Sequence, residues 1–124
     1  MYTATVILAA VLGVAVIAMG AAYLIAPTAS AKGFGLPEWP DGALAAWLNI
    51  KGIRDLAMGA AILVLLATSG PHAMGWYLLV SAVVPIGDAV IVLRHGGSKL
   101  LALAMHGATA AVVAAVAVVL LLAG

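Results

Sequence analysis

Four long, uninterrupted apolar stretches are the feature that most limits how this chain can fold. They run over about residues 4–26, 43–68, 73–94 and 99–123. A helix needs about 20 mostly apolar residues to cross roughly 30 Å of hydrocarbon, and each stretch is long enough. Membrane-barrel strands would be about 10 residues long with alternating polarity. These continuous runs, rich in Ala and Leu, therefore predict membrane-spanning helices.

The composition excludes the water-soluble classes of protein. Of the 124 residues, 67% are hydrophobic and only 7% are charged, whereas a soluble domain has about 45–50% apolar and about 25% charged residues. The absence of Cys rules out a disulfide framework or a zinc-thiolate site. A formal net charge of +1 provides no basic surface for nucleic acid. We therefore expect an integral membrane protein with the lipid bilayer, and no nucleic acid, among its partners.

Turn-forming residues separate the apolar stretches and leave short connections between them. Residues 69–72 read Ser-Gly-Pro-His and residues 95–98 read His-Gly-Gly-Ser, with Ser98 placed to cap the last helix. Short connections force neighbouring helices to run antiparallel. We therefore predict an all-α membrane protein, an antiparallel four-helix transmembrane bundle that forms one integral membrane domain over residues 1–124.

The distribution of Lys and Arg predicts the orientation of the chain in the membrane. Lys32 lies in the first connection, and Arg94 and Lys99 flank the third, whereas the termini and the second connection have no basic residue. Short cytoplasmic loops are enriched in such residues. We expect the first and third connections to face the cytoplasm of a bacterial inner (plasma) membrane, with both termini outside.

Five ionisable side chains lie within the apolar stretches: Lys51, Arg54, Asp55, Asp88 and His106. A charge near the centre of a membrane helix costs about 2.5–3.5 kcal/mol, so these groups should face the interior and satisfy one another. At about 1.5 Å of rise per residue, all five lie roughly 9–18 Å from the expected cytoplasmic ends of their helices. Three helices therefore place polar groups at similar depths.

Helical spacing predicts which of these groups meet. Lys51 and Asp55 are four residues apart and can pair directly. Arg54 cannot face Asp55, its neighbour in the sequence, so its expected partner is Asp88 on another helix. Asp88 shares its helix face with Tyr77.

Small and neutral polar residues predict how the helices pack together. Gly13, Gly20, Gly52 and Gly59 should permit close helix approach, and Asn49 should form a hydrogen bond between helices.

The predicted site has seven members. Asp55, Asp88 and His106 are the candidate catalytic residues, and Lys51, Arg54, Trp47 and Tyr77 are the candidate substrate-binding residues. A carboxyl group would act as general acid or base, with the histidine as its proton partner. The two cations would set the pKa values of the carboxyl groups or stabilise an oxyanion. No metal or other cofactor is expected, because those cations compete for the carboxylates.

Three interpretations of this site stay open. The first is acid–base chemistry on, or binding of, a lipophilic small molecule. The second is a proton-coupled small-molecule transporter acting as a dimer, which would be a homo-oligomer, although the first apolar stretch contains no charge. The third is a structural or accessory membrane subunit, whose charges form a neutral network that sets the helix register. The sequence does not decide whether the protein is an enzyme.

Four sequence motifs resemble one small family of membrane proteins. They are Gly33-Phe34-Gly35-Leu36-Pro37, Lys51-Gly52-Ile53-Arg54-Asp55, Pro85-Ile86-Gly87-Asp88 and His106. The family is catalogued only as a domain of unknown function, occurs in bacteria and fungi, and is broadly DoxX-like in having four helices. The resemblance implies a four-helix membrane protein and no assigned activity.

Overall fold

The computed structural model describes residues 2–123, which are helical with connecting turns and contain no strand. The elements are α1 (Tyr2–Ile25), α2 (Pro27–Lys32), the 3₁₀ turn η1 (Gly42–Ala45), α3 (Ala46–Thr68), α4 (Pro71–Ser81), α5 (Val83–Arg94), α6 (Lys99–Leu101), the π-helical turn η2 (Ala102–Gly107) and α7 (Ala108–Ala123). The prediction of an all-α protein is confirmed for this range.

Three helical stretches within residues 2–123 are long and apolar enough to cross a membrane. They are Tyr2–Ile25, Pro71–Arg94 and Lys99–Ala123. Helix α3 has a similar length of 23 residues, but it also carries three charged side chains, Lys51, Arg54 and Asp55. The span predicted over residues 43–68 thus differs from the other three in charge rather than in length.

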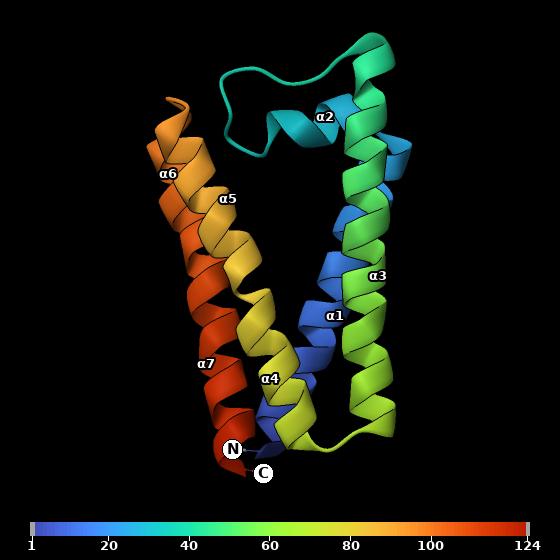
Figure 1. Cartoon of the computed structure of the whole chain (residues 1–124), viewed down its shortest axis with the longest axis vertical. Helices are drawn as coiled ribbons and strands as arrows, with labels where there is room; N and C mark the ends of the chain where they lie inside the picture. Colours follow the sequence, from blue (N-terminus) through green and yellow to red (C-terminus); the bar gives the residue numbers. More distant parts are fainter. Residues whose placement is uncertain (1, 124) are drawn as a thin grey trace.

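The helices form two arms that meet at one end and diverge toward the other (Figure 1). In the first arm, α1 packs along α3. In the second, α4 packs along α7, and α5 packs against η2. Contacts of α1 with α7 and of α3 with α4 join the arms. At the open end, α2 and the loop that follows it lie between the arms (Figure 1).

Glycines bring the backbones of α1 and α3 into direct contact. A Cβ atom added to Gly20 would lie 2.6 Å from the carbonyl oxygen of Gly52, and one added to Gly59 would lie 2.6 Å from that of Gly13. Real Cβ atoms do not approach so closely, so only glycine permits this helix crossing. The predicted close packing is confirmed, and Asn49 adds the predicted interhelical bond by donating to the carbonyl of Tyr23 at 2.9 Å.

Apolar packing between α4 and α7 forms the main hydrophobic core of the described residues. Its buried members include Met74, Leu78, Val113, Val116, Ala117 and Leu120. Burying a Leu, Val or Met side chain contributes about 1.5–3 kcal/mol relative to leaving it exposed. This core lies toward the end where the arms meet, which leaves the other end free to hold polar groups.

Two of the predicted regular spans are interrupted. The stretch predicted over 73–94 divides at Ala82 into α4 and α5, because Pro85 has no N–H to donate to the carbonyl of Ser81 and its ring crowds that turn. The stretch predicted over 99–123 contains the π-helical turn η2, which carries His106. Single π-helical turns are frequent at functional sites.

The helix starts also differ in detail. Helix α3 begins at Ala46, three residues after the start predicted at about residue 43, because residues 42–45 form a 3₁₀ turn with the Asp41 side chain accepting from the N–H of Gly42 at 2.8 Å. The predicted cap is confirmed at Ser98, whose Oγ accepts from the N–H of Leu101 at 3.2 Å.

Candidate functional site

Lys51 and Asp55 form a close ion pair on α3. The Nζ atom of Lys51 lies 2.6 Å from Oδ2 of Asp55, one helical turn away, as the spacing predicts. Asp55 is buried, with 8% of its surface exposed, so its charge depends on this partner. The pair is thus a preformed acid–base unit within the helix.

Aromatic rings surround the ammonium group of Lys51. Its Nζ lies 4.1 Å from the ring centroid of Tyr23 and 5.5 Å from that of Phe34. Tyr23 is buried and its hydroxyl donates to the carbonyl of Ser30 at 3.4 Å. The negative faces of the rings attract the cation, which holds Lys51 at the open end of the first arm.

His106 is held by a hydrogen bond that determines its tautomer. Its Nε2 lies 2.7 Å from the carbonyl oxygen of Phe34, and its ring centroid lies 4.3 Å from that of the Phe34 side chain. A carbonyl oxygen only accepts hydrogen bonds, so Nε2 must carry a proton. The other ring nitrogen, Nδ1, is therefore the atom at which His106 gains or loses a proton.

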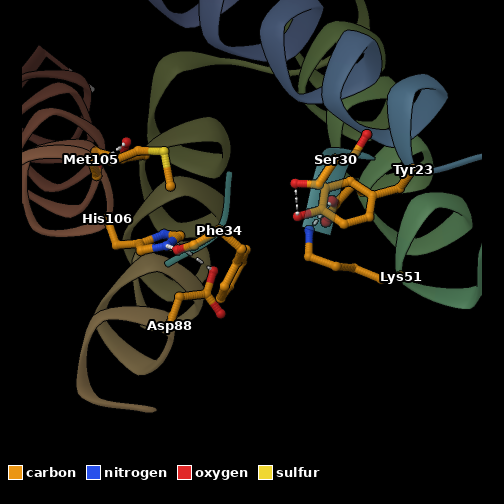
Figure 2. A network of polar contacts seen from close by, with 9 residues as sticks. Tyr23, Ser30, Phe34, Lys51, Asp88, Met105 and His106 are labelled. Carbon is orange, nitrogen blue, oxygen red and sulfur yellow. Dashed lines mark hydrogen bonds and ion pairs between the residues drawn. The ribbon is translucent and has the colours of Figure 1, made fainter. Parts of the chain in front are cut away.

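Asp88 faces that second nitrogen. Its Oδ2 lies 4.0 Å from Nδ1 of His106, an ion-pair distance that is longer than a hydrogen bond. Figure 2 shows Phe34, Asp88 and His106 on one side, with Lys51 and Tyr23 on the other. A small rotation of the carboxyl group would allow a proton to pass between the two residues.

The loop after α2 ties the two arms together. Besides the contacts of Phe34, the carbonyl of Gly35 accepts from the N–H of Ser98 at 2.8 Å. Gly35 has a φ of 113°, a conformation that side chains disfavour. Gly97 has no room for a Cβ against the Gly35 carbonyl oxygen. We call residues 33–36 the strap, because they cross from the first arm to the second beside His106.

Two cavities are bordered by both Lys51 and Asp88. The smaller has a volume of about 100 Å³ and the larger about 470 Å³. Both are lined by Lys51, Asp55, Met58, Val84 and Asp88. Because the same acidic and basic side chains border both spaces, the ion pair on α3 and the carboxyl group on α5 form a single site between the arms.

The other predicted substrate-binding residues divide between the two cavities. Tyr77 lines the smaller cavity, and its hydroxyl donates to the carbonyl of Met58 at 3.2 Å. Trp47 and Arg54 line the larger cavity, and both are exposed. His106 lines neither cavity and reaches the site only through Asp88.

The predicted ion pair between Arg54 and Asp88 is wrong. Within residues 2–123, no nitrogen of Arg54 lies within 4.0 Å of a carboxylate oxygen. The two side chains border the same cavity without meeting, because the arms diverge there (Figure 1). Asp88 has His106 as its nearest basic partner instead.

Sequence reasoning missed two site residues, Phe34 and Tyr23. Phe34 is the single phenylalanine of the chain and lies in the Gly33–Pro37 motif, which contributes to the family resemblance but predicts no role for Phe34 in the site. Tyr23 lies on α1 and Lys51 lies on α3, so no spacing rule within one helix links them. A lone aromatic between two glycines was the one available signal for Phe34.

The described residues offer no evident metal site. Within residues 2–123, no three His, Asp or Glu side chains are grouped closely enough to hold an ion. The groups that are present can transfer protons and bind polar atoms of a ligand.

Comparison with protein families identifies the chain. Residues 13–120 match the family described as a domain of unknown function, DUF4267, so the chain belongs to that family. Comparison with curated proteins and with solved structures gave no match. The family therefore assigns no activity, and only the geometry of the site bears on the function.

Proposed function

We propose that the protein binds a lipophilic small molecule in the larger cavity, between α3 and α5, and exposes it there to acid–base groups. The observation that carries this proposal is that Lys51, Asp55 and Asp88 border a space whose other walls are mostly apolar. Ligand sites typically combine apolar walls with a few convergent polar groups.

The proposal includes a fourth membrane span. Helix α3 would cross the bilayer with the other three in an antiparallel bundle, and its charges would face the cavity or their partners rather than lipid. The Lys51–Asp55 pair supports this, since pairing lowers the cost of a charge at depth. The wider likeness to DoxX-type proteins stays a prediction.

The proposed chemistry is proton transfer to or from the bound molecule. Asp88 would act as general acid or base at the cavity wall. On the side of Asp88 away from the cavity, Nδ1 of His106 would accept a proton from the Asp88 carboxyl group or return it. Lys51, held by Asp55 and Tyr23, would stabilise negative charge that develops on a substrate oxygen. Candidate reactions for such groups are isomerisation, ring opening of an epoxide, and cyclisation.

Ligand binding is tested with a probe and two neighbouring substitutions on α5. The protein in lipid nanodiscs is irradiated with a neutral long-chain alcohol that carries a diazirine, and labelled residues are mapped by mass spectrometry. Val84 lines both cavities, whereas the adjacent Val83 lines neither. We expect Val84→Trp to remove labelling at Met58 and Ile91, and Val83→Trp to leave it unchanged. Equal labelling in both variants would overturn the proposal.

Chemistry is tested separately. Lipid extract from the expressing cells is incubated with the wild-type protein and with Asp88→Asn, and the products are compared by mass spectrometry. A product that needs Asp88 supports an enzyme. Cavity labelling without any such product would contradict the proposed catalysis but still support the proposed ligand binding. If Asp88→Asn instead mainly lowers the unfolding temperature, the structural interpretation gains.

A further inference from the structure

Arg54 is a cation without an anionic partner at the proposed binding site. Within the described residues, the other ionisable groups of the site face one another, Lys51 with Asp55 at 2.6 Å and Asp88 with His106 at 4.0 Å. The Arg54 guanidinium has no hydrogen bond or ion pair in that range, and its side chain borders the larger cavity. In a membrane span such as the one proposed for α3, a charge is costly unless something neutralises it.

The walls around Arg54 suit an alkyl chain. On α3, Trp47 and Ile50 precede Arg54 at spacings that place all three on one face, and all three border the cavity. On α5, Val84 and Ile91 face them from the second arm. The guanidinium thus borders a cavity with largely apolar walls, an arrangement that suits the charged head and alkyl chain of an amphiphile.

The size of the cavity limits the number of chains. Its volume of about 470 Å³ lies within the range of roughly 300–1,000 Å³ that small-molecule sites have. That is space for one extended chain, whereas a two-chain phospholipid is larger. A ligand that fits within this volume has a single chain.

We infer that the ligand is a single-chain amphiphile with an oxyanion head, a carboxylate or a phosphate, bound by Arg54. This inference rests on the proposed function and names its substrate class. The planar guanidinium donates two parallel hydrogen bonds to either head group. Asp88 borders the same space, but its carboxyl group faces Nδ1 of His106 at 4.0 Å and makes no ion pair with Arg54, which leaves the guanidinium for the ligand. The chain lies along Trp47 and Ile50.

The experiment measures competition against the neutral diazirine alcohol in nanodiscs of zwitterionic lipid. The competitors are a long-chain fatty acid, an alkyl phosphate and an alcohol of equal chain length, together with a two-chain anionic phospholipid. For the wild-type protein, we expect one of the single-chain anions to compete at a concentration about tenfold lower than the alcohol, the effect of a charge-assisted bond. The better of the two anions identifies the head group.

Three substitutions locate the preference. Arg54→Gln should abolish the advantage of the anion and keep labelling by the neutral alcohol, and Arg54→Lys should retain part of the advantage. Arg94→Gln is the matched control, because Arg94 lies at the end of α5 and does not line the cavity. The control should behave as the wild type.

Three results would overturn the inference. They are equal competition by fatty acid, alkyl phosphate and alcohol; an anion preference that survives in Arg54→Gln, which would place the guanidinium among lipid head groups; and stronger competition by the two-chain phospholipid. Any of these, with labelling still lost in Val84→Trp, rejects the anion and keeps the proposed cavity. Labelling that persists in Val84→Trp rejects the cavity itself.

Discussion

The Nε2 atom of His106 lies 2.7 Å from the carbonyl oxygen of Phe34, a residue 72 positions earlier in the chain. This bond joins the second arm to the strap and leaves Nδ1 directed at Asp88. One backbone carbonyl thus selects which nitrogen of the histidine can take part in proton transfer.

The tautomer of His106 is the first prediction. Because Nε2 donates to a carbonyl, neutral His106 should carry its proton on Nε2, and only Nδ1 should change protonation during a pH titration. The ¹⁵N chemical shifts of the labelled ring measure this directly in nanodiscs. Exposed His95 serves as an internal comparison. A neutral form with the proton on Nδ1 would contradict the assignment.

Breaking the Lys51–Asp55 pair should destabilise the protein more than removing it entirely. Asp55→Asn leaves the cation of Lys51 without its partner, which costs about 3 kcal/mol, at the low end of the range for buried pairs because 29% of the Lys51 side chain is exposed. The double variant Lys51→Met with Asp55→Leu should recover most of that loss. Unfolding in denaturing detergent measures both. Equal loss of stability in the single and the double variant would show that the ion pair stabilises the fold more than apolar side chains at the same positions do.

Backbone contact between α1 and α3 predicts that substituting a glycine at the crossing destabilises the protein far more than substituting one elsewhere. Gly52→Ala should lower the free energy of unfolding by about 1–3 kcal/mol, because the new Cβ would lie 2.7 Å from the carbonyl oxygen of Gly20 and force the helices apart. Gly87→Ala is the control, since nothing lies within 4 Å of its added Cβ. That control should be neutral or should stabilise α5 by up to about 1 kcal/mol. Equal effects would contradict the described crossing.

Crowding the strap should release it from the second arm. A Cβ at Gly97 would overlap the carbonyl oxygen of Gly35, so Gly97→Ala should break the bond between Ser98 N–H and that oxygen. Backbone amides of residues 33–36 and 97–98 should then exchange hydrogen at least several-fold faster. Gly33→Ala, whose added Cβ meets its nearest atom at 3.6 Å, should leave exchange unchanged. Unaltered exchange in Gly97→Ala would show that the strap is not held there.

Local patterns predicted much of what lies within single helices. Spacing alone predicted the Lys51–Asp55 pair, and the glycines predicted close helix packing without saying that it joins α1 to α3. The same patterns failed at Pro85 and at the π-helical turn carrying His106, where the apolar run continues while the backbone departs from regular geometry. Periodicity does not report such a local change of hydrogen bonding.

The order of residues along this chain determined that it is helical and apolar enough to meet a membrane, and it predicted that acidic and basic groups lie at similar depths on several helices. Which of those groups meet across different helices was decided only by the angle between the arms and by the strap. Divergence of the arms separates Arg54 from Asp88, and the strap brings Phe34 to His106. Side-chain partners across helices depend on these rigid-body placements, which sequence periodicity within one helix does not encode.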